Sequence, residues 1–154
     1  QSDVWAIVKT NEALVSMSVE AKVNESFGDE ILEKWLIAGN TDRSIENRHE
    51  RWQYIQKYLP EGDYKHVRYQ ILHRCAASVI EAQRFRFKHA VFIVQSFKSP
   101  DKSFRDFKVF CDSLGISSGR DRIAKTHVGD ISLSVGWADC EFATSDEIAT
   151  VVSE

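Results

Sequence analysis

Three charged residues near the start of the chain, Asp3, Glu20 and Lys22, are of the types that phosphodiester hydrolysis uses. Carboxylates are hard oxygen ligands that suit Mg²⁺ or Mn²⁺, and the backbone carbonyl of Ala21 could add a further oxygen. A lysine beside such a metal can orient or deprotonate the attacking water, or stabilise the charge that develops on the phosphate. These residues predict a divalent-metal site with an activated water, provided that the local fold brings them together.

A β-hairpin is the element that must position these residues. Residues 3–10 and 13–23 alternate in polarity and are rich in β-branched side chains, which is typical of strands. A turn centred on Asn11-Glu12 makes one face wholly apolar, and we expect this face to be the buried one. Its pairs are Val4 with Val19, Ala6 with Met17, and Val8 with Val15. On the other face Asp3 lies opposite Glu20, and Lys22 shares that side because residues i and i+2 do.

The rest of the chain predicts further helices and strands. Hydrophobic spacing favours helices over residues 29–38, 42–59, 64–86 and 104–114, and strands over residues 88–97 and 131–135. Asp29 is expected to cap the first of these helices, and residues 98–103 and 116–122 read as loops. The tail after Thr144 predicts a short helix. A long helix that leads into a buried strand favours an α/β fold with helices packed on a sheet.

Composition narrows the class of protein. The 154 residues fit a single domain with a real core, and the net charge of −3 requires a local basic patch for nucleic-acid binding. No apolar run is long enough to cross a membrane, so no membrane partner is expected. The three cysteines are far apart and form no zinc or CxxC pattern, which favours free thiols in the cytoplasm.

The helix predicted over residues 64–86 carries polar residues that could lie above the hairpin site. Gln70, His73 and Arg74 are neighbours at spacings of three and four residues. Gln70 is the first candidate for a catalytic role over the metal and His73 the second. An internal polar network that links the helix to the sheet explains the same pattern equally well.

Several other polar or charged residues are secondary candidates. Glu25 could approach the hairpin site or cap the turn that follows it, and Gln95 and Ser96 could line the site from the end of a buried strand. The run over residues 84–88, Arg-Phe-Arg-Phe-Lys, could form a basic edge for a phosphate backbone. The solvated end of a helix whose two phenylalanines pack inward is the more common structure for such a run.

The pattern Asp3 … Glu20-Ala21-Lys22 resembles the PD-(D/E)XK superfamily of restriction-endonuclease-like phosphodiesterases. The chain is also similar to a bacterial family of unknown function in that superfamily, through Ser-Asp-Val-Trp-Ala, Val-Glu-Ala-Lys-Val-Asn-Glu-Ser-Phe-Gly, Arg-Tyr-Gln-Ile-Leu-His-Arg and Val-Gln-Ser-Phe. Ser2 stands where the superfamily motif has proline. Asp106-Phe107-Lys108 mimics the triplet, but it falls in a predicted helix and is rejected.

The resemblance implies a restriction-endonuclease-like core, in which a mixed central sheet with an antiparallel hairpin is flanked by helices. It implies one nuclease-like domain over residues 1–154, with a helix and a first strand missing before Gln1. Asp3, Glu20 and Ala21 would bind Mg²⁺ or Mn²⁺, and Lys22 would serve the water. The implied partner is nucleic acid, chiefly DNA, with a homodimer as one way to cut both strands.

Two other interpretations remain open from the sequence. The chain could be a non-catalytic nuclease-like module that binds protein or nucleic acid, which the acidic net charge and the missing proline favour. It could also be a plain α/β domain with no functional site at this hairpin. An inward Lys22 paired with Glu20, and Asp3 turned away from both, would favour the plain domain.

Overall fold

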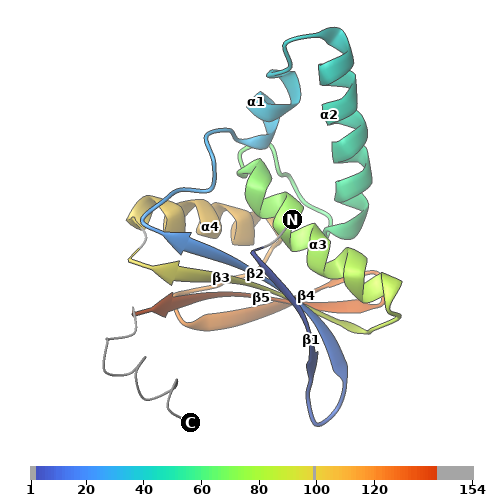
Figure 1. The fold of residues 1–154 in the computed structure, drawn as a ribbon, viewed down its shortest axis with the longest axis vertical. Helices are drawn as coiled ribbons and strands as arrows, with labels where there is room; N and C mark the ends of the chain where they lie inside the picture. Colours follow the sequence, from blue (N-terminus) through green and yellow to red (C-terminus); the bar gives the residue numbers. More distant parts are fainter. Residues whose placement is uncertain (1–2, 99, 142–154) are drawn as a thin grey trace, which may run out of the picture.

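The fold is an α/β arrangement in which helices pack on a mixed sheet (Figure 1). It is known from a computed structural model, which describes residues 3–98 and 100–141. The elements in chain order are β1 (Val4–Lys9), β2 (Leu14–Val23), α1 (Leu32–Ile37), α2 (Asp42–Ile55), a short 3-10 helix (Gln56–Tyr58), α3 (Tyr69–Arg84), β3 (His89–Phe97), α4 (Asp101–Ser113), β4 (Arg122–Val128) and β5 (Ile131–Cys140). The helix predicted after Thr144 lies outside the described residues.

The five strands lie in the order β1-β2-β3-β5-β4. β1 runs antiparallel to β2, β3 runs parallel to both β2 and β5, and β4 runs antiparallel to β5. The predicted mixed sheet with an antiparallel hairpin is therefore confirmed. The parallel pair β2 and β3 is joined through the helical segment that ends with α3, as parallel neighbours require a long crossover.

The register of the hairpin agrees with the prediction. Val4 pairs with Val19 and Val8 with Val15, and the turn lies between Lys9 and Leu14. Thr10 closes the turn, because its N–H donates to the carbonyl of Ala13 over 2.9 Å and its side chain accepts from the backbone of the same loop. Asp3 thus comes directly beside Glu20 at the end of the paired region.

The expectation for the buried face of the hairpin was wrong. On β2 the polar residues Ser16, Ser18, Glu20 and Lys22 are almost fully buried, whereas on the apolar face Val15 is buried at 8% exposure and Val4 of β1 is 52% exposed. α3 and α4 pack on the polar side of β2. On the neighbouring strand β3 the same face of the sheet is apolar and belongs to the hydrophobic core. Two small serines fit under a helix, and the two charged residues neutralise each other there. The opposite face is half-buried and largely apolar.

α3 confirms the helix that hydrophobic spacing predicts within residues 64–86, and its apolar stripe holds it to the sheet. Ile71, Cys75 and Val79 are fully buried. The helix begins at Tyr69 rather than at residue 64, because Arg68 forms an isolated β-bridge with Ile31 and cannot be helical. α3 therefore starts directly above the end of β2, with its first turn over Glu20.

The C-terminal half of the described chain departs from the prediction in two places. α4 begins at Asp101, so the predicted loop over residues 98–103 is half helical, with Pro100 before the first turn. The strand β4 was not predicted, and β5 continues to Cys140. Aromatic contacts join these elements to the core, for instance between Phe110 and Phe92, whose ring centroids lie 6.1 Å apart.

α1 and α2 form a pair beyond the sheet (Figure 1). α2 begins at a capping box in which Thr41 accepts from the N–H of Ser44 over 3.2 Å. The prediction that Asp29 caps α1 was wrong, because Ile31 holds that position without a side-chain cap. Within the described residues, every helix is too short or too polar to cross a lipid bilayer.

Candidate functional site

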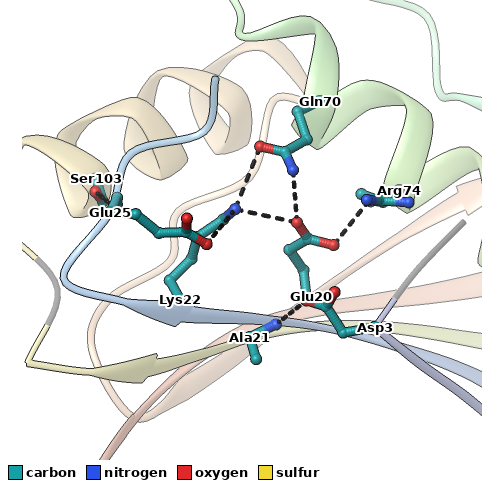
Figure 2. A network of polar contacts seen from close by, with 8 residues as sticks. All are labelled: Asp3, Glu20, Ala21, Lys22, Glu25, Gln70, Arg74 and Ser103. Atoms are coloured by element: carbon teal, nitrogen blue, oxygen red, sulfur yellow. Dashed lines mark hydrogen bonds and ion pairs between the residues drawn. The ribbon is translucent and has the colours of Figure 1, made fainter. Parts of the chain in front are cut away.

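A polar pocket of about 410 Å³ lies between the end of β2 and the first turns of α3. Asp3 reaches it from the position just before β1, Glu20 and Lys22 from β2, and Gln70 from α3 (Figure 2). The structure therefore brings together the four predicted catalytic residues from three separate elements. The other residues that line the pocket are Glu25, Ser26, Gly28 and Arg74.

Glu20 is the centre of the polar network in this pocket and is 1% exposed. Its Oε1 atom accepts a hydrogen bond from Gln70 Nε2 over 2.8 Å and lies 3.1 Å from Lys22 Nζ. Its other oxygen, Oε2, lies 2.8 Å from Arg74 Nε, a close charge contact that is not aligned as a hydrogen bond. Both oxygens therefore face cations or an amide donor.

Lys22 is equally enclosed, with 2% of its surface exposed. Besides Glu20, its ammonium group lies 3.3 Å from Glu25 Oε1 and donates to Gln70 Oε1 over 3.3 Å. It also lies 5.1 Å from the centroid of the Phe27 ring. A buried ammonium needs such compensation, because the loss of hydration costs more than one ion pair returns.

The charge balance of the pocket leaves room for a cation. Three carboxylates, those of Asp3, Glu20 and Glu25, face two cations, Lys22 and Arg74, so the formal balance is −1 when all are ionised. Burial raises the pKa of Glu20 above its usual value of 4.5, against the opposing effects of Lys22 and Arg74, and the nearby Asp3 raises it further. The carboxylate of Glu20 thus lacks full compensation for its burial.

Asp3 lies at the open side of the pocket and is exposed. Its Oδ2 atom accepts a hydrogen bond from the N–H of Ala21 over 2.8 Å. Ala21 therefore meets Asp3 through its amide, whereas we had predicted its carbonyl as a metal ligand. This contact ties the first residue of the hairpin to the strand that carries Glu20. Lys22 is inward and paired with Glu20, as a plain domain requires, but Asp3 lines the same pocket.

The two helix candidates have different positions. Gln70 lies over the site, since it binds Glu20 and Lys22 with the two ends of its amide. The prediction for His73 was wrong, because its ring stacks on Tyr69 at 6.0 Å, on the side of α3 that faces α2. Burial there lowers the pKa of His73 to about 4.

Arg74 belongs to the site although the sequence analysis did not select it. The signal was its spacing, because a residue four positions after Gln70 occupies the same helix face. Its Nε and Nη1 atoms are enclosed, while the side chain as a whole stays 15% exposed. Arg74 therefore connects the buried carboxylate of Glu20 with the pocket.

The remaining candidates lie elsewhere or contribute indirectly. Ser96 is buried beside Lys22 in the sheet, whereas Gln95 points to the opposite face and contacts Cys140 Sγ at 3.5 Å. Asp106 of the rejected triplet lies in α4, as expected, and pairs with Arg68 at 3.1 Å. The contact of Ser103 Oγ with the carbonyl of Glu25, at 2.8 Å, anchors the loop after β2.

The donor set fits a hard cation held by few protein ligands. The described residues contain no group of three or more histidine, cysteine or acidic side chains that would enclose a metal. Asp3 and Glu20 are nevertheless neighbours in one pocket. Mg²⁺ keeps several of its waters and commonly uses one or two carboxylates together with substrate phosphate, so two carboxylates meet its needs.

A larger pocket of about 830 Å³ lies between α1, α2 and the loop before α3. Its walls include the apolar residues Leu32, Leu36 and Trp52. The acid–cation contact on its wall, between Lys65 and Asp63 at 3.8 Å, is exposed rather than buried, so size alone does not mark the reactive site. The smaller pocket combines a buried carboxylate, two cations and an amide, which makes it the candidate site.

Comparison with known proteins gives a family without a described activity. Residues 1–142 match the family described as a domain of unknown function, DUF6946. No curated protein matches the chain, and neither does any solved structure. Because the match spans most of the 154 residues, the chain belongs to the DUF6946 family.

Proposed function

We infer that this protein is a metal-dependent phosphodiesterase of restriction-endonuclease-like fold that hydrolyses the backbone of nucleic acid, with DNA as the first candidate. The observation that carries the proposal is the buried pair of Glu20 and Lys22, 3.1 Å apart on one strand and facing a pocket that Asp3 also lines. Ordinary strand faces keep such charges in water. Perturbed charged groups that converge on a pocket are typical of functional sites.

The order of elements around the pocket supports the fold part of the proposal. An antiparallel hairpin carries the acid and the Glu-x-Lys triplet, a helix follows, and the next strand lies parallel beside the triplet. This is the order that the resemblance to the PD-(D/E)XK superfamily implies.

Three free thiols at Cys75, Cys111 and Cys140 support a reducing compartment, in line with a cytoplasmic protein.

Asp3 and Glu20 would hold the cation, which would supply positive charge next to the scissile phosphate and make water more acidic. The water oxygen attacks phosphorus, one ester P–O bond breaks, and the products are a phosphate monoester and a hydroxyl. Lys22 stabilises the charge on the phosphate oxygens with its ammonium group. Gln70 holds both Glu20 and Lys22 in position through the two ends of its amide.

Calorimetric titration with Mn²⁺ is the first test. Wild type is expected to bind Mn²⁺, and Glu20→Gln is expected to lose binding, because an amide is a poor ligand for a hard cation. Glu12→Gln in the exposed hairpin turn serves as the matched control and should bind as wild type does. Binding should strengthen as pH rises, because protons compete for Glu20, whose pKa is raised.

Cleavage is tested next with labelled single- and double-stranded DNA in Mg²⁺. Lys22→Met is expected to abolish cleavage while circular dichroism shows a folded protein. Equal Mn²⁺ affinity in wild type and Glu20→Gln, or full cleavage by both Glu20→Gln and Lys22→Met, would contradict the proposal.

A non-catalytic module is the second candidate, and one observation favours it. Both oxygens of Glu20 already lie within 3.1 Å of a cation or an amide donor, so the network is closed without a metal. In that case the pocket stabilises the fold, and binding to nucleic acid or protein occurs without metal. Unchanged binding to a nucleic acid in Glu20→Gln, together with no Mn²⁺ uptake by wild type, would establish this function instead.

A further inference from the structure

Three aromatic rings are stacked on the surface at the far end of α3 from the pocket. Trp5 and Phe85 have ring centroids 5.6 Å apart at 22°, and Phe85 and Phe87 lie 5.6 Å apart at 23°. Trp5 is 40% exposed and Phe85 is 42% exposed. We call Trp5, Phe85 and Phe87 the aromatic patch. The expectation that both phenylalanines pack inward is therefore wrong for Phe85.

The packing of the protein accounts for only one of these rings. Phe87 packs against the hydrophobic core, whereas Trp5 and Phe85 are not among the described residues that do so. The indole N–H of Trp5 donates to Ser16 Oγ over 3.0 Å, which fixes the orientation of the exposed ring. The patch thus presents two aromatic rings, of Trp5 and Phe85, each about two-fifths exposed.

Two arginines, Arg84 and Arg86, lie on either side of Phe85 in the chain. The guanidinium of Arg84 lies 5.7 Å from the centroid of the Phe85 ring, although it also pairs with Glu81 at 3.5 Å. Arg86 follows in a left-handed conformation, with φ of 59°, and is exposed. The net charge of the whole chain is −3, so two arginines beside exposed rings make the local charge more positive than that of the chain as a whole.

The patch and the pocket lie on the same side of the hairpin. Trp5 shares a strand face with Asp3, two residues and about 7 Å away along β1. α3 connects the same two places, since Arg74 contacts Glu20 near the start of the helix and Arg84 lies at its end. The distance along the helix from Arg74 to Arg84 is about 15 Å. One extended strand can therefore reach both places.

We propose that the aromatic patch, with Arg84 and Arg86, is a stacking site for the bases of single-stranded nucleic acid, whose backbone runs along α3 toward the pocket. Aromatic rings stack with any base, and arginines compensate the phosphate charge, which is the combination that single-strand binding sites use. The link from the patch to cleavage rests on the proposed function. The stacking site itself is independent of metal.

Fluorescence anisotropy with a labelled oligo(dT) of 20 nucleotides tests the site, in EDTA and at low salt. Wild type is expected to bind this strand more tightly than a duplex of equal length. Phe85→Leu, which keeps an apolar side chain without a ring, should weaken binding about tenfold or more. Trp5→Phe, which keeps a ring, should retain most of the affinity. Ile123→Ala serves as the control, because Ile123 is 62% exposed on β4, at the opposite edge of the sheet from β1 and Trp5.

The outcomes separate this site from the proposed catalysis. Binding that is lost in Phe85→Leu and kept in Glu20→Gln supports the stacking site, even where no variant cleaves DNA. Equal binding by wild type and Phe85→Leu overturns it, and so does a preference for duplex. Self-association of wild type that disappears in Phe85→Leu, with no oligonucleotide bound, also overturns it and assigns the patch to a second copy of the chain.

Discussion

The loss of Lys22 alone should destabilise the fold more than the loss of Lys22 and Glu20 together. Lys22→Met leaves the carboxylate of Glu20 buried, with Arg74 as its remaining cation. Removal of one partner from a buried ion pair costs about 3–5 kcal/mol, and we expect about 3 kcal/mol because Arg74 stays in contact. Lys22→Met/Glu20→Gln should regain about 2 kcal/mol, since no buried carboxylate is left and the side chain of Arg74 stays 15% exposed.

The stability that Lys22→Met loses should also depend on pH. Burial raises the pKa of Glu20, and Lys22 opposes that rise, so the pKa rises further in Lys22→Met. At pH 5 more of this carboxyl is protonated in the folded variant, and less charge is buried. The free energy lost in Lys22→Met should therefore be smaller at pH 5 than at pH 8.

Urea denaturation of wild type, both single variants and the double variant measures these differences, as a double-mutant cycle requires. Lys88→Met is the control, because Lys88 and Asp130 form an exposed pair, and its loss should cost less than about 1 kcal/mol. A double variant that is as unstable as Lys22→Met would refute the reasoning. It would mean that the carboxylate of Glu20 is not what destabilises the single variant.

Three further predictions concern parts of the fold away from the candidate site. Burial lowers the pKa of His73 to about 4 in the folded protein, so wild type should lose stability relative to His73→Gln in calorimetry as pH falls from about 6.5 to 4. Thr41→Ala removes the acceptor at the start of α2 and should cost about 1 kcal/mol in urea denaturation. Gly62→Ala should cost about 3 kcal/mol in the same assay, because its Cβ would lie 2.0 Å from the carbonyl oxygen of Ser113; wild-type stability would show that the loop yields instead.

The register of the hairpin and the buried stripe of α3 could be predicted because both depend on local periodicity. A slip of one residue would place Val4 opposite Ser18 or Glu20 instead of Val19, so the pattern selects one pairing. The stripe of Ile71, Cys75 and Val79 recurs at every fourth residue and has no equivalent strand pattern. The meeting of Asp3 and Glu20 followed from the register alone.

The buried side of the hairpin could not be predicted in this way. Local polarity favoured the valine face, whereas the structure buries Glu20 and Lys22 because each compensates the charge of the other under α3. That compensation exists only after folding and has no signature within either strand. β4 was missed for a related reason, since an edge strand that includes Arg122 and Lys125 shows little of the apolar content of a buried strand.

The position of β1 at the edge of the sheet affects the fraction of molecules in which Asp3 lines the pocket. β1 is bonded to one neighbour, and Asp3 precedes its first paired residue, Val4. Edge strands open with less free energy than the core, so amide hydrogens of β1 should exchange faster than those of β2. Each opening withdraws Asp3 while Glu20, Lys22 and Gln70 stay in place with α3. A ligand that contacts Asp3 therefore binds only the closed population and protects β1 from exchange as it does so.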